Sequence, residues 1–164
     1  MEYRSTVTHT DGTIDADPAT YADKIVTNTL RAALAQGYNL DADADTGRLT
    51  LTCPGRNTIE IIPAAPLPKP TPAQRREIIN LALTPGTYVY TRSNVPRIAT
   101  GDRILHRQTV RALENGGYLG RLTGNGTPAA LSLLAYLTIG RGGKDSAALA
   151  AMLRNVYSPR HAAA

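Results

Sequence analysis

Residues 106–119 read HRQTVRALENGGYL, a basic segment whose apolar residues recur at helical spacing and which ends in two glycines. At 100° per residue, Thr109 and Leu113 fall on one side of a helix, and Arg107 and Arg111 lie nearly opposite. Arginines four residues apart repel each other in an isolated helix, but phosphate groups lying across them would remove this penalty. The glycines predict the end of the helix. The segment therefore predicts an amphipathic helix with a basic exposed face.

The start of this helix has two solutions. A helix over about 103–115, capped by Asp102, places Ile104 beside the arginines. A helix that begins near His106 leaves Ile104 in the preceding turn, and we favour this later start. The predicted buried face comprises Leu105, Thr109, Ala112 and Leu113, with Val110 at its edge. The predicted outward residues are Arg107, Gln108 and Arg111.

The neighbouring segments predict further elements on both sides of the basic helix. A helix is predicted over 71–86, TPAQRREIINLALTPG, with Thr71 as its N-cap and Pro72 as its first residue. A short strand, TYVYT, and a turn-rich stretch with one helical turn at most, SNVPRIATGD, precede the basic helix. After it come the strand YLGRL, the turn TGNG and the apolar SLLAYLTIG, followed by a last helix over KDSAALAAMLRNVY, capped by Asp145 or Ser146.

This order of elements, with RQTVRALENGGYLGRL at its centre, resembles the winged helix-turn-helix superfamily, and AYLTIGRGG resembles its second wing strand. The resemblance covers about residues 71–157. It implies that the 106–115 helix enters a DNA major groove, with the 121–130 wing over the backbone or minor groove. A helix that begins at Thr127 is the alternative to a wing strand over 128–139. The positions that match the recognition helix and first wing strand are Thr109, Val110, Leu113, Gly117, Tyr118 and Leu119.

Residues 1–62 predict a small β-α-β-β module. Tyr3–His9 alternates like an edge strand, and a helix is expected from about Pro18 to Gln36, with Asp17 as its N-cap. RLTLTC and NTIEIIP, joined by PGRN, predict a hairpin. About 60 residues bury too little surface for much stability, so we expect the module to associate with another copy or a partner. A small-ligand sensor in this module is an open alternative for which no residue argues.

Five prolines within residues 63–72 predict an extended linker, with a loop inside one domain as the alternative. The charge changes sign at the same place: residues 1–63 carry five basic and nine acidic side chains, and residues 64–164 carry thirteen and four. The predicted fold is therefore α+β, with the β-α-β-β module (1–62), the linker (63–72) and a basic winged-helix-like domain (73–164). A charge asymmetry of this kind indicates an anionic partner for the C-terminal part.

The expected function is sequence-specific binding of double-stranded DNA, as in a transcriptional regulator that acts as a homodimer. Its base-reading residues would be Arg107, Gln108 and Arg111. The residues expected on the DNA backbone are Arg75, Arg76, Arg92, Arg97, Arg103, Arg121, Arg141 and Lys144. The alternative is a non-enzymatic interaction or assembly protein, of mobile-element or phage type, whose winged helix contacts protein.

Other function classes find little support in the sequence. No apolar run approaches the roughly 20 residues of a membrane helix, and MEYRSTVTHTDG at the N-terminus lacks the apolar region of a signal peptide. The single cysteine, Cys53, excludes an intrachain disulfide. These features predict a soluble, cytoplasmic protein.

Two motifs depart from the binding loops that they partly match. LDADADTG has Thr46 and Thr52 where a calcium loop needs Gly and Glu, and IGRGGKDS has Thr138 in place of the first glycine of a phosphate-binding loop. The three histidines are scattered, so no catalytic, metal or cofactor site is predicted. We therefore expect a protein that is not an enzyme.

Overall fold

The computed structural model describes residues 1–84, 88–92, 95–120 and 130–159. The chain divides into two compact units: unit 1 comprises Met1–Pro68 and Tyr136–Ala164, and unit 2 comprises Lys69–Ala135. Within the described residues, both units combine helices with antiparallel strands, which confirms the predicted α+β class. The boundary at Pro68 lies inside the predicted linker. The predicted C-terminal domain of 73–164 is too long, because the chain returns to unit 1 at Tyr136.

The described part of unit 1 contains a six-stranded antiparallel sheet in the order β2-β1-β6-β5-β4, with β3 also paired to β1. The predicted hairpin is confirmed as β5 and β6, with Leu51 opposite Ile59, and the predicted first strand as β1, with Val7 opposite Ile59 on its other side. The expectation that β1 is an edge strand is wrong, because β2 and β6 pair with it on its two sides. The strands are β1 (Glu2–Thr8), β2 (Ile14–Ala16), β3 (Tyr21–Ala22), β4 (Asn39–Ala42), β5 (Leu49–Thr52) and β6 (Thr58–Pro63).

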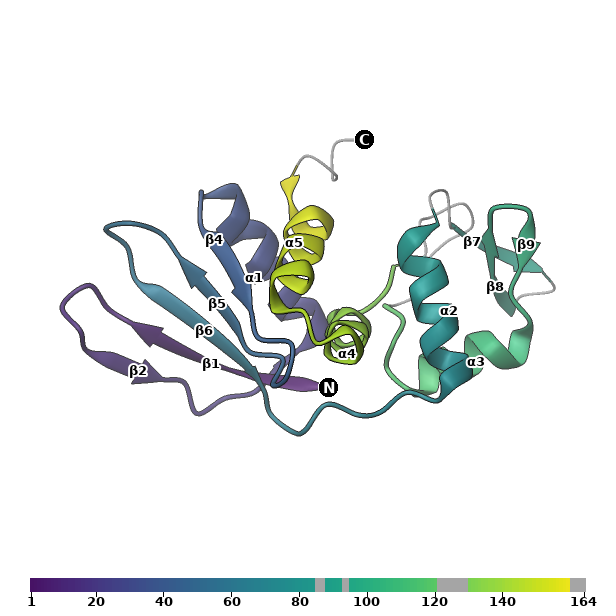
Figure 1. The fold of residues 1–164 in the computed structure, drawn as a ribbon, viewed down its shortest axis with the longest axis horizontal. Coiled ribbons are helices and arrows are strands. Elements are labelled where there is room, and N and C mark those ends of the chain that lie inside the picture. The colour runs from purple at the N-terminus through teal and green to yellow at the C-terminus, as the bar shows by residue number, and fades with distance from the viewer. Residues whose placement is uncertain (85–87, 93–94, 121–129, 160–164) are drawn as a thin grey trace. The chain divides into compact units, whose positions relative to one another are not determined.

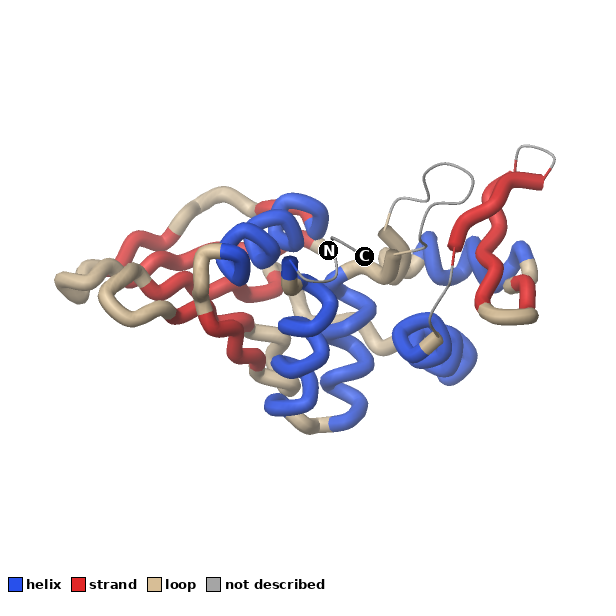
Figure 2. The backbone as a smooth tube through the Cα atoms, turned by 90° about the horizontal axis from the view of Figure 1, so that it is seen from above, coloured by secondary structure: helices blue, strands red, loops and turns tan. Residues whose placement is uncertain are grey.

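Two helices cover one face of this sheet, α1 (Asp23–Ala35) and α5 (Ser146–Tyr157), which lie side by side (Figures 1 and 2). The period of two along β5 buries Leu49 and Leu51, while Thr50 and Thr52 lie on the other face. The core below the helices is aliphatic, and burial of each such side chain contributes about 1.5–3 kcal/mol. Its fully buried leucines include Leu30, Leu40, Leu49, Leu51, Leu149 and Leu153.

The first helix begins later than predicted. Asp17 is not its N-cap; its carboxylate accepts hydrogen bonds from the Ala19 amide at 2.9 Å and from the Tyr21 hydroxyl. Tyr21 lies opposite Tyr3 in the pairing of β3 with β1. This pairing keeps the backbone extended as far as Ala22, so that the helix starts at Asp23.

Unit 2 begins with α2 (Pro72–Leu83), whose predicted N-terminus is confirmed. The Thr71 hydroxyl accepts from the Gln74 amide at 3.2 Å, and the Gln74 side chain accepts from the Thr71 amide at 2.9 Å, which is a capping box. The predicted short strand is β7 (Tyr88–Arg92). It belongs to a three-stranded sheet of described residues, in the order β7-β8-β9, with β8 (Val95–Thr100) and β9 (Arg103–Ile104).

The turn-rich interpretation of residues 93–102 is wrong, because most of this stretch forms β8. Ile98, Ala99 and Thr100 are all buried, and β8 contacts the helix that follows, α3 (Arg107–Asn115). The favoured start of this basic helix is confirmed, since its N-cap is His106 and Ile104 lies in β9. Strands thus occupy the place where a helix-turn-helix has its first helix.

After α3 the chain forms the base of an antiparallel hairpin. Leu119 pairs with Leu131, and the Gly120 and Ser132 amides donate to the Ala130 and Tyr118 carbonyls at 2.8 and 3.0 Å. The predicted turn TGNG lies outside the described residues.

The predicted second wing strand is wrong beyond Ser132, because Leu133–Gly143 forms helix α4. The run Leu133–Leu137 is buried throughout, which excludes the alternation of a half-exposed strand. The chain then passes directly into α5, whose predicted N-cap Asp145 accepts from the Ala148 amide at 3.0 Å. The described residues therefore do not confirm a winged helix-turn-helix arrangement.

Candidate nucleic-acid interface

The positive charge of the chain is concentrated in unit 2. Its 67 residues, 69–135, carry nine basic and three acidic side chains, a net charge of +6, whereas unit 1 carries nine and ten, a net charge of −1. Basic and acidic side chains are thus nearly equal in number in unit 1, whereas basic side chains are in excess in unit 2. An anionic partner would therefore be attracted to unit 2.

Helix α3 carries the predicted base-reading residues on one exposed face. Val110 and Leu113 point into unit 2, with exposed fractions of 3% and 0%. At 100° per residue, Gln108 lies opposite these two, Arg111 lies about 60° from Gln108, and Arg107 lies on the flank next to Val110; all three are exposed. The predicted buried face was partly wrong: Ala112 is exposed, and Val110 is buried at its centre rather than at its edge.

The helix is fixed at both ends. At its start the His106 ring accepts, through Nδ1, from the Gln108 amide at 3.2 Å. At its end the Tyr118 amide donates to the Leu113 carbonyl at 2.9 Å, around Gly117 with φ of 75°. A position with left-handed backbone after a helix favours glycine, and this explains why Gly117 follows the end of α3.

Arg107 and Arg111 are the unpaired cations of this face. The ion pairs among the described residues join His9 to Asp15, Arg48 to Glu60 and Arg103 to Glu77, and neither arginine takes part in one. Glu114 is the acidic residue of α3, and it is exposed. The two arginines, one turn apart, are thus free to meet an external anion.

Helix α2 lies beside α3 and adds two further exposed arginines. The side-chain nitrogen of Gln74, Nε2, donates to the Ala112 carbonyl at 3.1 Å and so joins the two helices. Between them runs a groove lined by residues of both helices, among them Arg76 and Gln108. Arg75 and Arg76 are both exposed on α2, in the same unit as the α3 face.

The remaining predicted contacts of unit 2 differ in their surroundings. Arg103 is engaged by the Glu77 carboxylate. Arg97, in β8, is half-buried, and its Nε is buried without a hydrogen-bond partner among the described residues. Arg121, and the side chain of Arg92, lie outside what the structure describes.

Arg141 and Lys144 belong to unit 1, contrary to their predicted place in the C-terminal domain. The Arg141 guanidinium donates to the Leu67 carbonyl at 3.1 Å and so joins the end of α4 to the segment before the unit boundary. Lys144 has a positive φ of 53° between α4 and α5. The structure therefore gives Arg141 a role in holding unit 1 together.

The acidic repeat of residues 41–45 forms a turn. The Asp43 carboxylate accepts from the Asp45 amide and the Thr46 hydroxyl, both at 2.9 Å. The Thr46 hydroxyl bond, and then the Asp45 amide bond, lower the pKa of Asp43. No group of three His, Cys, Asp or Glu side chains arranged to hold a metal ion is found in the described ranges.

Two features of unit 2 were missed in the sequence. Glu77, the partner of Arg103, precedes it by 26 residues, and nothing in the local pattern pairs them. His106 as an N-cap could have been found, because a polar side chain stands directly before the first periodic residue of the helix.

No helix in the described parts of the chain combines the length and the apolar character that crossing a membrane requires. Comparisons of the chain with protein-family models, with curated proteins and with solved structures found no match.

Proposed function

We propose that unit 2 binds double-stranded DNA, with the exposed face of α3 in the major groove, and that the protein acts as a sequence-specific regulator. The observation that carries this proposal is the combination of Arg107, Gln108 and Arg111 on one exposed face, with neither arginine in an ion pair among the described residues.

The dimensions of α3 suit this role. An α-helix with its side chains is about 10–12 Å across, and the major groove is about 12 Å wide. The nine residues of α3 extend roughly 13.5 Å along the helix axis. Arginine can contact guanine with two hydrogen bonds, and glutamine can contact adenine in the same way. Arg107 and Gln108 lie at the N-terminal end of the helix, the end that contacts bases in helix-turn-helix proteins. This end also carries the positive pole of the helix dipole.

Phosphate contacts would come from α2. Arg75 and Arg76 are exposed, and Arg76 lines the same groove as Gln108. They would anchor the protein without reading sequence, because phosphates are the same at every base pair. A homodimer would place two α3 helices over half-sites about one helical turn apart, and the stoichiometry on a palindromic duplex measures this directly.

The test is a titration of fluorescent duplexes with the full chain over a series of salt concentrations, after selection of a preferred duplex from a random pool. We expect the affinity to fall steeply with salt, because each phosphate contact releases a counterion. Arg107→Ala with Arg111→Ala should remove the preference for the selected duplex. Arg75→Ala with Arg76→Ala should weaken binding to all duplexes alike.

The matched control is Arg4→Ala with Lys24→Ala, which removes two exposed cations from unit 1 and leaves unit 2 unchanged. It should keep the preference and nearly the whole affinity. Absence of binding at low salt, or a preference that survives the Arg107/Arg111 change, would overturn the proposal. The first of these outcomes would favour an interaction or assembly protein whose basic face contacts an acidic protein surface.

A further inference from the structure

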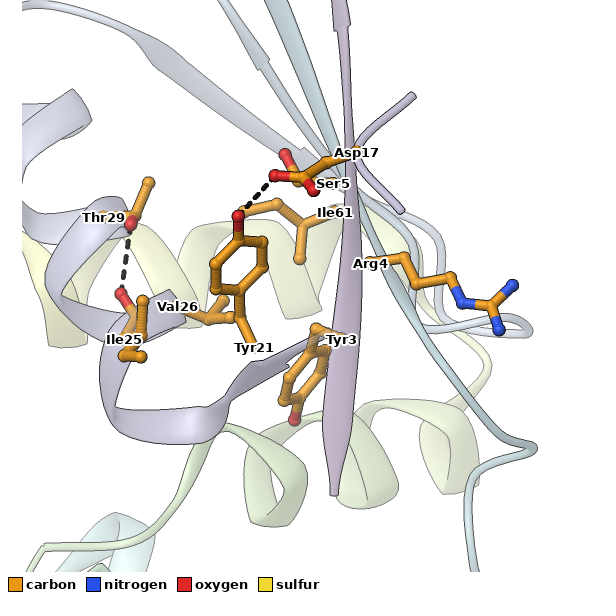
Figure 3. A pocket seen from close by; sticks show the side chains of 9 residues that line it. All are labelled: Tyr3, Arg4, Ser5, Asp17, Tyr21, Ile25, Val26, Thr29 and Ile61. Carbon is orange, nitrogen blue, oxygen red and sulfur yellow. Dashed lines mark hydrogen bonds between the residues drawn. The ribbon is translucent and has the colours of Figure 1, made fainter. Parts of the chain in front are cut away.

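Unit 1 contains a cavity of about 280 Å³ between α1 and the strand β1 (Figure 3). Strand β6 supplies part of its floor through Ile61, and the segment that joins β2 to β3 supplies Asp17 and, beyond it, Tyr21. All of these elements belong to unit 1. The cavity is therefore independent of the basic face of unit 2.

The deep part of the cavity is apolar. Val26 of α1 and Ile61 of β6 are 4% and 3% exposed. At the mouth, Ile25 of α1 is 52% exposed although it is a large aliphatic residue. An exposed isoleucine at the rim of an apolar cavity leaves surface that a ligand can cover.

One end of the cavity is acidic and is held in a fixed geometry. The Tyr21 hydroxyl donates to the Asp17 carboxylate, and Figure 3 shows the two side chains pointing toward each other. The Ala19 amide donates to the other carboxylate oxygen at 2.9 Å. The Tyr21 bond and then the Ala19 bond lower the pKa of Asp17, so that this carboxylate is charged at neutral pH. The pairing of Tyr21 with Tyr3 fixes the backbone that carries the ring.

The basic residue at this cavity does not offset that charge. Arg4 precedes Ser5 and follows Tyr3 on β1, so its side chain leaves the strand on the opposite face. Figure 3 shows its guanidinium pointing away from Tyr21 and Asp17. The cavity thus combines an apolar interior, an aromatic ring and one carboxylate, with no cation among its lining residues directed into it.

From this combination we propose that the cavity binds a small amine with an apolar body, its ammonium group beside Asp17 and Tyr21 and its body against Val26 and Ile61. An ammonium group is attracted both to a carboxylate and to the face of a tyrosine ring. The volume equals that of roughly nine water molecules at about 30 Å³ each, which limits the ligand to about ten non-hydrogen atoms. Anionic compounds of the same shape are disfavoured by repulsion from the exposed Asp17 carboxylate.

The experiment uses NMR on the ¹⁵N-labelled full chain, with phenethylamine as the probe. The neutral 2-phenylethanol and the anionic phenylacetate are comparison ligands of similar shape and size. We expect phenethylamine to shift the amide signals of residues around the cavity and to bind about fivefold to tenfold more tightly than the alcohol. The carboxylate should bind least.

Two variants separate the contributions of charge and shape. Asp17→Asn keeps one acceptor, Oδ1, for the Ala19 amide, and places an NH2 group beside the Tyr21 hydroxyl, which can accept from it. The change removes the charge, so it should bring amine and alcohol to equal affinity. Thr29→Trp places a bulky side chain at the mouth, from an exposed position on α1, and should abolish binding of both. The control Asp41→Asn removes an exposed carboxylate of β4 and should leave the preference intact.

The proposal is overturned if the amine and the alcohol bind wild type equally, or if Thr29→Trp, with a folded amide spectrum, still binds the amine. It is also overturned if the shifted signals lie elsewhere in the chain. None of these outcomes depends on DNA binding by unit 2.

Discussion

Glu77 of α2 accepts a hydrogen bond from the guanidinium of Arg103 in β9, whereas Arg107, four residues further along the chain, has no acidic partner in the described part of the protein. The Glu77 side chain is largely covered, with 15% of its surface exposed. Two arginines that look equivalent in the sequence are therefore different: one holds a strand to a helix, and the other is available to a ligand.

Neutralising Glu77 should make Arg103 available as well. Glu77→Gln removes the charge partner of Arg103, so we expect DNA to bind more tightly and the slope of log affinity against log salt to steepen by up to about one. A partly exposed ion pair stabilises a protein by about 0–1 kcal/mol, so its loss should leave unit 2 folded.

The control for this change is Glu60→Gln, because Glu60 pairs with Arg48 at 3.9 Å in unit 1 and its loss alters the net charge equally. It should leave the salt slope unchanged. Equal steepening in both variants would show that overall charge, and not Arg103, sets the affinity.

The packing of α4 on α5 leads to a second prediction. A Cβ atom added at Gly140 would lie 2.7 Å from a methyl group of Leu149, whose side chain is 1% exposed. Alanine is favoured over glycine inside a helix by about 0.5–1 kcal/mol. Overpacking a buried contact costs about 1–3 kcal/mol, and this term should dominate. Gly140→Ala should therefore lower the free energy of unfolding measured in urea.

The same helix provides the control. A Cβ atom at Gly143 would have no neighbour within 4 Å. Only the difference in helix propensity then remains, so Gly143→Ala should raise the free energy of unfolding by up to about 1 kcal/mol. If the two variants were equally stable, the close approach of Gly140 to Leu149 would be disproved.

The elements that could be predicted are those whose signals are local. Thr71 and Pro72 predict the start of helix α2, and the turn residues between β5 and β6 predict their hairpin. The shared side of Arg107 and Arg111 on α3 also follows from spacing, because residues four apart share a side of any helix. The centre of its buried face does not, because Val110 is buried and Ala112 is exposed.

The elements that could not be predicted depend on distant partners. Asp17-Pro18 has the composition of a helix start, but the pairing of Tyr21 with Tyr3 keeps this segment extended. SLLAYLTIG is a continuous apolar run, which a buried strand and a buried helix share, so periodicity could not separate them; the structure forms a helix from Leu133. The apolar face of α5 likewise does not reveal that it packs on α1 and β4 of unit 1.

The cavity of unit 1 could not be predicted from the sequence either. Asp17, Tyr21 and Ile25 are close in the chain, but Ile61 reaches the cavity only through the pairing of β6 with β1.

Two buried tyrosines of unit 1 should make the protein sensitive to alkaline pH. Burial raises the pKa of the Tyr3 phenol, and the Asp23 carboxylate raises it further. Burial also raises the pKa of Tyr157, and its neighbours Tyr136 and Asp23 add to this effect, while Arg31 opposes it. A phenol whose pKa is raised by folding stabilises the folded state fully below the unfolded pKa, which is about 10. This contribution is lost as the pH rises above that value.

Phenylalanine variants test both the alkaline effect and the hydrogen bonds. The Tyr3 hydroxyl donates to Asp23 at 3.3 Å, whereas the Tyr157 hydroxyl is buried with no hydrogen-bond partner among the described residues. At pH 7, Tyr3→Phe should therefore cost about 0.5–1.5 kcal/mol, and Tyr157→Phe should be neutral or stabilising. Between about pH 8 and pH 10.5, urea unfolding should show a smaller loss of stability in each variant than in wild type. The change to phenylalanine keeps the ring and removes the phenolic hydroxyl, which is the group that titrates. Identical losses in all three proteins would therefore mean that ionisation of these two phenols does not limit stability.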